Sequence, residues 1–273
     1  MSQINKFEKI LVHLPMHKTA STWFQQYFFC ESNGFILLNN SKNPKNDPII
    51  EWLIKGTSSD FSFDYIVNLL EERIKTSDKK NLVPVISAER LTGHPINGGI
   101  DRLSIAFRIN MLFKKSKIIV VRRKESNKYL KSIYYQLLSE GYYKSYKKMI
   151  SENRNSWKET NFSKSYFNLG NYINILEKNK KVEILDYDNI FNKNLNELSK
   201  TFLNIGITLS NKKIDNIFKI NHNKSKKYLT INTFIIRFFN FFSKRELSNS
   251  FFNLIPGNVS KRINNFVIRV IPF

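Results

Sequence analysis

Hydrophobic and polar positions along the chain follow two spacings, one typical of strands and one typical of helices. Short apolar runs rich in β-branched residues predict buried strands over 8–13, 35–38, 83–86, 117–124 and 182–185. Apolar residues at a helical spacing predict helices over 20–31, 49–54, 62–77, 101–114, 126–140 and 194–205, and helical, aromatic-rich structure over 142–180. Because strands alternate with helices, we expect an α/β domain with a central, mostly parallel sheet flanked by helices.

The stretch Leu11–Gln25 is predicted to run from a strand through a short loop into a helix. One lysine and three hydroxyl residues lie where that helix starts: Lys18, Thr19, Ser21 and Thr22. A helix start attracts phosphate-like anions, because it offers unpaired N–H groups and the positive end of the helix dipole. The alternative is an ordinary capped helix whose Ser and Thr side chains bond only to their own backbone. An ordinary nucleotide P-loop is excluded, because no glycine occurs between residues 1 and 33.

Two more charged positions follow predicted strands. Glu89 comes shortly after the third strand, and Arg122 and Arg123 close the fourth. Ligands of open α/β sheets bind beyond the carboxyl ends of the strands, so Glu89 is placed where an acid–base group can act. The planar forks of the two arginines suit phosphate oxygens. For Glu89 the alternatives are a glutamate at a helix start or an ion pair with Arg90. For the two arginines the alternative is solvated charge after a strand.

Three segments resemble, in the same order, motifs of the sulfotransferases that use 3′-phosphoadenosine 5′-phosphosulfate (PAPS), in particular bacterial carbohydrate-type members. Residues 18–23, Lys-Thr-Ala-Ser-Thr-Trp, are similar to the 5′-phosphosulfate loop, with His17 where that family usually has Pro. Residues 87–99, SAERLTGHPINGG, are similar to a segment Ser-x-Glu-Arg-Leu-Ser-Gly that is followed by Pro and a Gly pair. An Arg pair and then Ser-x-Tyr-x-Gln at 132–136 are similar to the 3′-phosphate segment. The resemblance covers the first half of the chain and implies a P-loop-like three-layer α/β/α domain.

The resemblance also implies roles for individual residues. Lys18 would neutralise charge on the departing 5′-phosphate, and Trp23 would stack on the adenine. Glu89 would act as general base, while His94 is a rival base or a substrate contact. Arg90 is placed with His94 on the acceptor side. The residues implied to hold the 5′-phosphosulfate and adenine of PAPS are Lys18, Thr19, Ala20, Ser21, Thr22 and Trp23.

The 3′-phosphate of PAPS is expected to bind one of the two arginines together with Ser132. Counting back from Ser132 at the spacing usual in the family reaches Lys124 instead of an arginine. Arg122 and Arg123 therefore both remain candidates. Arg123 is favoured, because the alternation that buries Val121 ends with the strand.

The composition and net charge of the chain indicate which classes of partner to expect. The 273 residues carry a net charge of +22 with a pI near 9.9, which favours anionic partners such as a nucleotide, an acidic glycan or an anionic membrane. The basic residues are spread along the chain and no nucleic-acid motif occurs, so nucleic acid is not an expected partner. Cys30 is the single cysteine and the four histidines are scattered, so neither a disulfide nor a metal site is expected.

The last part of the chain differs from the rest. We expect a sulfotransferase-like domain over 1–220 and a basic, amphipathic, helical extension over 221–273. The segments 231–243 and 258–270 either pack on the domain or lie on an anionic membrane. The first ten residues lack the apolar region of a signal peptide, and no apolar run has the length of a bilayer span. The expected location is the cytoplasm, including the inner face of the membrane.

These patterns lead to one functional hypothesis and two rivals. The hypothesis is transfer of a sulfuryl group from PAPS to an acceptor hydroxyl on a carbohydrate, which leaves adenosine 3′,5′-bisphosphate and needs no metal. The first rival is a P-loop kinase of a small metabolite, which would require ATP and Mg²⁺. The second is a basic nucleic-acid-binding protein without catalytic activity.

Overall fold

The computed structural model describes residues 7–39, 46–56, 60–95, 98–139, 145–150, 164–178, 180–192 and 195–209. The chain divides into two compact units, one formed by 1–125 with 162–220 and one formed by 126–161 with 221–273. The described part of the second unit consists of two helices, α5 (Asn127–Ser139) and α6 (Tyr146–Ile150). The helix predicted over 126–140 is therefore confirmed.

The first unit is built on a sheet of five parallel strands in the order β2-β3-β1-β4-β5. Every residue of the central strand β1 is buried, as expected for a parallel strand covered on both faces. Chain order reverses at β1, since β2 and β3 lie on one side of it and β4 and β5 on the other. Such a reversal leaves a crevice at the carboxyl ends of the strands, where ligands bind. The strands are β1 (Leu11–Pro15), β2 (Phe35–Leu37), β3 (Val83–Ser87), β4 (Lys117–Arg122) and β5 (Val182–Asp186).

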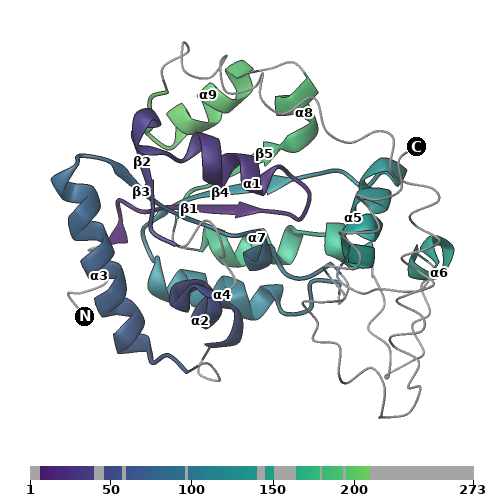
Figure 1. Cartoon of the computed structure of the whole chain (residues 1–273), viewed down its shortest axis with the longest axis horizontal. Helices are drawn as coiled ribbons and strands as arrows, with labels where there is room; N and C mark the ends of the chain where they lie inside the picture. Colours follow the sequence, from purple (N-terminus) through teal and green to yellow (C-terminus); the bar gives the residue numbers. More distant parts are fainter. Residues whose placement is uncertain are drawn as a thin grey trace, which may run out of the picture. The chain divides into compact units, whose positions relative to one another are not determined.

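Helices cover both faces of the sheet, which confirms the predicted three-layer α/β/α architecture (Figure 1). One face carries α1 (Ser21–Trp23), the π-helix η2 (Phe24–Phe28), α8 (Tyr187–Asn192) and α9 (Leu195–Asn204). The other face carries α2 (Pro48–Lys55), α3 (Phe63–Lys79), α4 (Arg102–Leu112) and α7 (Gly170–Glu177). Three short 3₁₀ turns connect these elements: η3 (Glu31–Asn33), η6 (Glu89–Thr92) and η7 (Lys164–Phe167).

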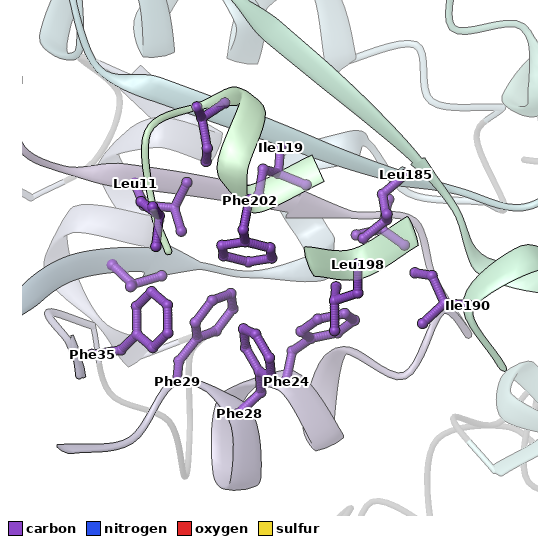
Figure 2. Packing of buried hydrophobic residues seen from close by; sticks show 14 of the residues in the cluster. Leu11, Phe24, Phe28, Phe29, Phe35, Ile119, Leu185, Ile190, Leu198 and Phe202 are labelled. Atoms are coloured by element: carbon purple, nitrogen blue, oxygen red, sulfur yellow. The ribbon is translucent and has the colours of Figure 1, made fainter. Parts of the chain in front are cut away.

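A cluster of aromatic side chains fills the space between the sheet and the layer formed by α1, η2, α8 and α9 (Figure 2). Phe28 lies at its centre, with its ring centroid 5.2–5.7 Å from those of five neighbouring aromatic residues. Strand residues such as Leu11, Ile119 and Leu185 close the cluster from the sheet side. The neighbours of Phe28 are Trp23, Phe24, Phe29, Phe35 and Phe202.

The helix predicted over 20–31 is wrong in its length and in the face it buries. Only three residues are α-helical, and the chain then widens into the π-helix η2, in which Phe29 N–H donates to Phe24 O at 2.7 Å. Widening rotates the buried face by about one residue. The helical spacing of Trp23, Phe24, Tyr27 and Phe28 predicts that these four share the buried face. In the structure Phe29 is buried, whereas Tyr27 is 40% exposed.

Other element ends agree with the sequence. Ser62, the first residue of the helix predicted over 62–77, caps α3, because its hydroxyl accepts the N–H of Tyr65 at 3.2 Å. Gly206, which directly follows the helix predicted over 194–205, has a φ of +74° just after α9. The first strand begins and ends later than predicted, at Leu11 and Pro15.

Several predictions concern residues outside the described part of the chain. They concern residues 151–163 of the helical structure expected over 142–180, the basic loop at 221–227, and the amphipathic segments 231–243 and 258–270. The domain boundary expected at 220 also lies outside the described residues. They stay predictions. Among the helices that the structure describes, none combines the length and apolar character needed to cross a membrane.

Candidate functional site

The loop 16–20 leads from β1 into α1 at the carboxyl edge of the sheet. Its start is tied to β4, because Met16 N–H donates to Val121 O at 2.9 Å. It also folds back on itself, because the hydroxyl of Thr19 donates to Met16 O at 2.6 Å. The loop thus has a fixed shape set by β1, β4 and its own buried threonine.

Two residues of this loop adopt a backbone conformation that side chains other than glycine rarely take. Lys18 and Ala20 have φ values of 61° and 59°. Such a conformation costs about 1–2 kcal/mol per residue, and in proteins it concentrates at ligand sites. Left-handed residues gather successive N–H groups into an anion-binding concavity. Within the described part of the chain the N–H groups of Lys18, Thr19 and Ala20 have no hydrogen-bond partner.

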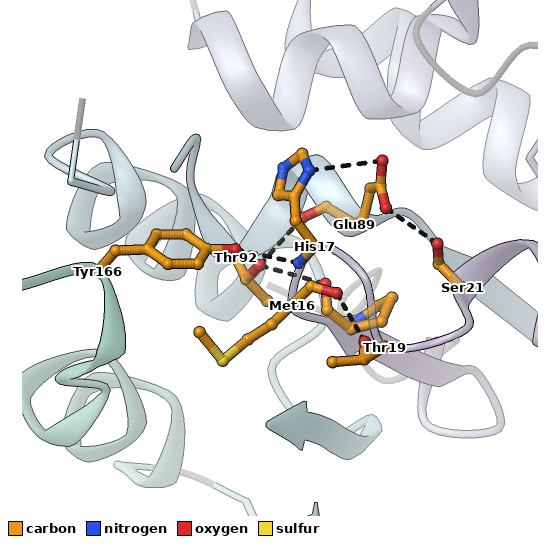
Figure 3. A network of polar contacts seen from close by, with 8 residues as sticks. Met16, His17, Thr19, Ser21, Glu89, Thr92 and Tyr166 are labelled. Carbon is orange, nitrogen blue, oxygen red and sulfur yellow. Dashed lines mark hydrogen bonds and ion pairs between the residues drawn. The ribbon is translucent and has the colours of Figure 1, made fainter. Parts of the chain in front are cut away.

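Glu89 lies beside this loop, at the start of η6 and two residues after β3 ends (Figure 3). One carboxylate oxygen, Oε2, accepts the hydroxyl of Ser21 at 2.9 Å. The other, Oε1, is 3.5 Å from Nδ1 of His17. The Glu89 side chain is 31% exposed, so its carboxylate is held in place and still open to solvent.

The ring of His17 is buried, since its side chain is 5% exposed. The backbone N–H of His17 donates to the hydroxyl of Tyr166 at 3.0 Å (Figure 3). The ring centroid of His94 lies 5.6 Å from that of His17, which places His94 next to the Glu89 group. Burial raises the pKa of Tyr166 to about 12, so its hydroxyl stays protonated at neutral pH.

The hydroxyl groups of Thr19, Ser21 and Thr22 have different surroundings. Thr19 and Ser21 are buried and already donate within the protein, to Met16 O and Glu89, whereas Thr22 is exposed. Trp23 is 2% exposed and packs on Phe24 and Phe28. The expectation that Trp23 stacks on an adenine therefore needs correction, because its ring faces the aromatic core and offers no open face.

Arg122, the last residue of β4, and Arg123, which follows it, make different contacts. Arg122 pairs with Asp186 at 2.6 and 3.1 Å, and this pairing raises the pKa of Arg122 and lowers that of Asp186. Arg123 has a longer ion pair, with Nε 3.5 Å from Asp188 Oδ1, and it also donates to Lys18 O at 3.1 Å, so its guanidinium lies against loop 16–20. The Arg123 guanidinium also lies 4.5 Å from the ring centroid of Tyr187. Of the two candidates, Arg123 is thus the one placed beside the loop.

The remaining predicted residues lie in different places. Arg90 is half-buried and forms an ion pair with Asp101, so it is engaged within η6 and the turn before α4. The alternative considered from the sequence, an ion pair between Glu89 and Arg90, does not form. Ser132 lies half-buried on α5 in the second unit.

A buried polar network fixes the end of β3 behind Glu89. Nδ1 of His13 and the hydroxyl of Ser87 lie 2.8 Å apart and share a hydrogen bond. The side-chain amides of Gln25 and Asn39 both donate to Ser87 O, at 2.8 and 3.0 Å. Asn39 also accepts the N–H of Ser87 at 2.8 Å. Three segments, carrying His13, Gln25 and Asn39, thus converge on Ser87, two residues before Glu89.

This network makes the stability of the fold sensitive to acid. Burial lowers the pKa of His13 from 6.5 to about 3, so the folded protein keeps the ring neutral. Below pH 6.5 the unfolded chain gains a proton that the folded chain does not bind. The free energy of unfolding is expected to fall by about 1.4 kcal/mol per pH unit from this residue, down to about pH 3. Urea denaturation at a series of pH values measures this slope.

The matched control for this prediction is His13→Asn, which keeps a polar group near Nδ1 and cannot gain a proton. The slope attributed to His13 should disappear in this variant between about pH 6.5 and pH 4. An unchanged slope in His13→Asn would assign the acid sensitivity to other groups.

Some residues that organise the site carry no sequence signal that distinguishes them. Arg102 is 4% exposed and donates to Thr92 O, Asn168 O and Tyr166 O at 2.8–3.0 Å. It thereby fixes Tyr166, the partner of the His17 N–H. Gly99, with a φ of +72°, leaves room for this arginine, since a Cβ atom there would lie 2.7 Å from the guanidinium. The contacts of Arg102 to Asn168 and Tyr166 span more than 60 residues and leave no local pattern.

A cavity of about 640 Å³ lies elsewhere, at the amino ends of β3 and β4, where Lys9, Lys117 and Thr208 line it. It is at the opposite edge of the sheet from Glu89 and is separate from the candidate site. Among the described residues, no group of three or more His, Cys, Asp and Glu side chains converges to hold a metal ion.

Comparison of the chain with models of known protein families, with curated proteins and with solved structures gives no match. In the candidate site, loop 16–20, Glu89 and Arg123 meet at the carboxyl edge of a parallel sheet.

Proposed function

We propose that the chain transfers a sulfuryl group from PAPS to an acceptor hydroxyl. The hydrogen bond from Ser21 to Glu89, at 2.9 Å, carries the proposal. It joins the segment that resembles a 5′-phosphosulfate loop to the segment that resembles a general-base segment, although the two residues are 68 positions apart in the chain. The open N–H groups of loop 16–20 add an anion site beside the same carboxylate.

In this proposal each residue has one task. The N–H groups of loop 16–20 and the ammonium of Lys18 hold the 5′-phosphosulfate and stabilise charge as the bond between sulfur and the bridging oxygen breaks. Glu89 takes the proton of the acceptor hydroxyl, whose oxygen forms the new bond to sulfur. Positioning and electrostatic stabilisation supply most of the rate, as in phosphoryl transfer.

The 3′-phosphate is assigned to Arg123, and the role expected for Ser132 from the resemblance stays a prediction. Arg122 is a poorer choice, because Asp186 already occupies its fork. Arg123 lies against loop 16–20 through Lys18 O, so one guanidinium can connect the two phosphate sites.

The acceptor side of the proposal follows the resemblance. A carbohydrate hydroxyl is the proposed acceptor, with His94 and Arg90 as candidate contacts and the cytoplasm as the proposed location. His94 is half-buried beside His17, at the same group as Glu89. A panel of glycans incubated with radiolabelled PAPS tests this part separately.

The first test is calorimetric binding of adenosine 3′,5′-bisphosphate at near-physiological salt, with AMP and ATP as competitors. Binding of the bisphosphate is expected to exceed that of AMP. Lys18→Ala and Arg123→Ala should each weaken it by about tenfold to a hundredfold, because each removes a charge-assisted contact to a phosphate. Lys124→Ala is the matched control, since Lys124 is exposed next to Arg123 and should leave affinity unchanged.

Three results would contradict this function. Equal or tighter binding of ATP would favour a kinase. Absence of nucleotide binding together with retention on nucleic acid at moderate salt would favour a nucleic-acid-binding protein. Weaker binding in Lys124→Ala but not in Arg123→Ala would move the 3′-phosphate contact to another position.

A further inference from the structure

Helix α4 presents large apolar side chains on its outer face. We call this face the α4 stripe and define it as Ile100, Leu103, Phe107 and Met111, which are 79%, 39%, 56% and 49% exposed. Leu103, Phe107 and Met111 follow one another at intervals of four residues along one side of α4, and Ile100 lies in the turn just before the helix. A separate set of residues fills the core under α4: Ile105, Ala106, Ile109 and Leu112. The α4 stripe is therefore not needed to hold the helix on the sheet.

The helix that carries the stripe is fixed by its neighbours. Arg108 donates to Leu53 O and Ile54 O of α2, at 2.7 and 2.6 Å. On the other side, the amide of Asn110 donates to Ile175 O of α7. The α4 stripe is thus a preformed surface that requires no folding before it can contact a partner.

Basic residues border the stripe. The ammonium of Lys178, at the end of α7, lies 6.0 Å from the ring centroid of Phe107. Lys114 and Lys115 are exposed just after α4, and Lys115 pairs with Glu8 at 2.9 Å. The surface combines apolar side chains that can enter a lipid layer with cations that can meet lipid phosphates.

We propose that the α4 stripe rests on an anionic lipid surface. Its apolar side chains would enter the boundary between headgroups and acyl chains, while Lys178 and Lys114 contact anionic headgroups. A second copy of the chain fits this surface less well, because a net charge of +22 repels another copy and is attracted by anionic lipid. The lipid contact goes beyond sulfuryl transfer and does not depend on it.

The test is sedimentation of the full chain with vesicles of phosphatidylcholine, alone or mixed with phosphatidylserine. We expect binding to the mixed vesicles that weakens as salt is raised, and little binding to phosphatidylcholine alone. Phe107→Ser should lower the partition coefficient by about tenfold or more, because the aromatic ring that would be buried in the lipid layer is removed. The control is Leu203→Ser on α9, which removes a side chain that is 62% exposed on the other face of the sheet and should leave binding unchanged.

A matched pair of charge reversals separates local contact from overall charge. Lys178→Glu and Lys200→Glu change the net charge equally, but only Lys178 borders the α4 stripe. Lys178→Glu is expected to weaken binding by about fivefold or more relative to Lys200→Glu. Equal loss in both variants would overturn the proposed surface, because binding would then follow net charge alone.

A spectroscopic measurement keeps the proposal testable even if Phe107→Ser folds poorly. After the emission of the unsubstituted chain, which has Trp23, Trp52 and Trp157, is subtracted, the added indole emission of Phe107→Trp should shift to shorter wavelength when mixed vesicles are added, while that of Leu203→Trp should not. Absence of vesicle binding, or binding without this shift, overturns the proposal. If the indole emission of Phe107→Trp already lies at short wavelength before vesicles are added, the chain itself covers the stripe. A dimer in sedimentation equilibrium that Phe107→Ser dissociates would assign the stripe to a second copy.

Discussion

Replacing Glu89 with Gln is expected to lower sulfuryl transfer by about 10²–10⁴-fold, the usual effect of losing a general base. The amide of Gln has the size of the carboxylate and can still accept the hydroxyl of Ser21, so the shape of the site should persist. It cannot take the proton of the acceptor. Release of adenosine 3′,5′-bisphosphate from PAPS in the presence of an acceptor measures the rate, and calorimetry should find bisphosphate binding unchanged.

Two further variants make this result specific. Glu72→Gln, at an exposed position of α3, makes the same chemical change away from the site and should keep full activity. His94→Asn tests the rival base. Near-normal turnover in Glu89→Gln combined with loss of turnover in His94→Asn would transfer the role of base to His94.

Replacing Phe28 with Ala should lower the free energy of unfolding by about 3–5 kcal/mol. Phe28 is 2% exposed and its ring packs against five other aromatic residues, so truncation leaves a cavity that rigid neighbours fill poorly. Urea and thermal denaturation measure the change. Because η2 continues directly from the helix that carries Ser21, the same variant is also expected to weaken bisphosphate binding.

The adjacent residue provides the control for this stability prediction. Tyr27 is 40% exposed, and its known hydrogen bonds from Cys30 and Asn33 use its backbone oxygen. Tyr27→Ala should therefore change the free energy of unfolding by no more than about 0.5 kcal/mol. Similar losses in both variants would show that η2 is not the π-helix described, since an α-helix would bury Tyr27 instead of Phe29.

Local patterns were sufficient to predict the layers of the fold. Continuous β-branched runs such as 117–122 predict strands buried on both faces, and each is followed by a helical spacing, so a parallel sheet follows. The π-helix could not be predicted in this way. Its extra residue per turn arises because Trp23, Phe24, Phe28 and Phe29 must all reach the core, which is a demand of packing and not of local spacing.

For the candidate site, sequence position predicted which strand ends carry polar groups but not which contacts they make. Glu89 and Arg123 were expected at the carboxyl edge and lie there, beside loop 16–20. The burial of Trp23 was not foreseen, since an aromatic residue after a loop suits both a core and a ligand platform. The support that Tyr166 gives to His17 comes from 149 positions away, beyond the reach of any local pattern.

The left-handed backbones of Lys18 and Ala20 have a consequence for affinity. A glycine-rich loop would reach this shape without strain but would also visit many others, and a ligand would have to select one of them. Here the side chains at both positions restrict the loop, and its contacts to Val121 and Arg123 hold it. The loop therefore loses its conformational entropy when the protein folds. Binding of an anion then requires little further loss of conformational entropy.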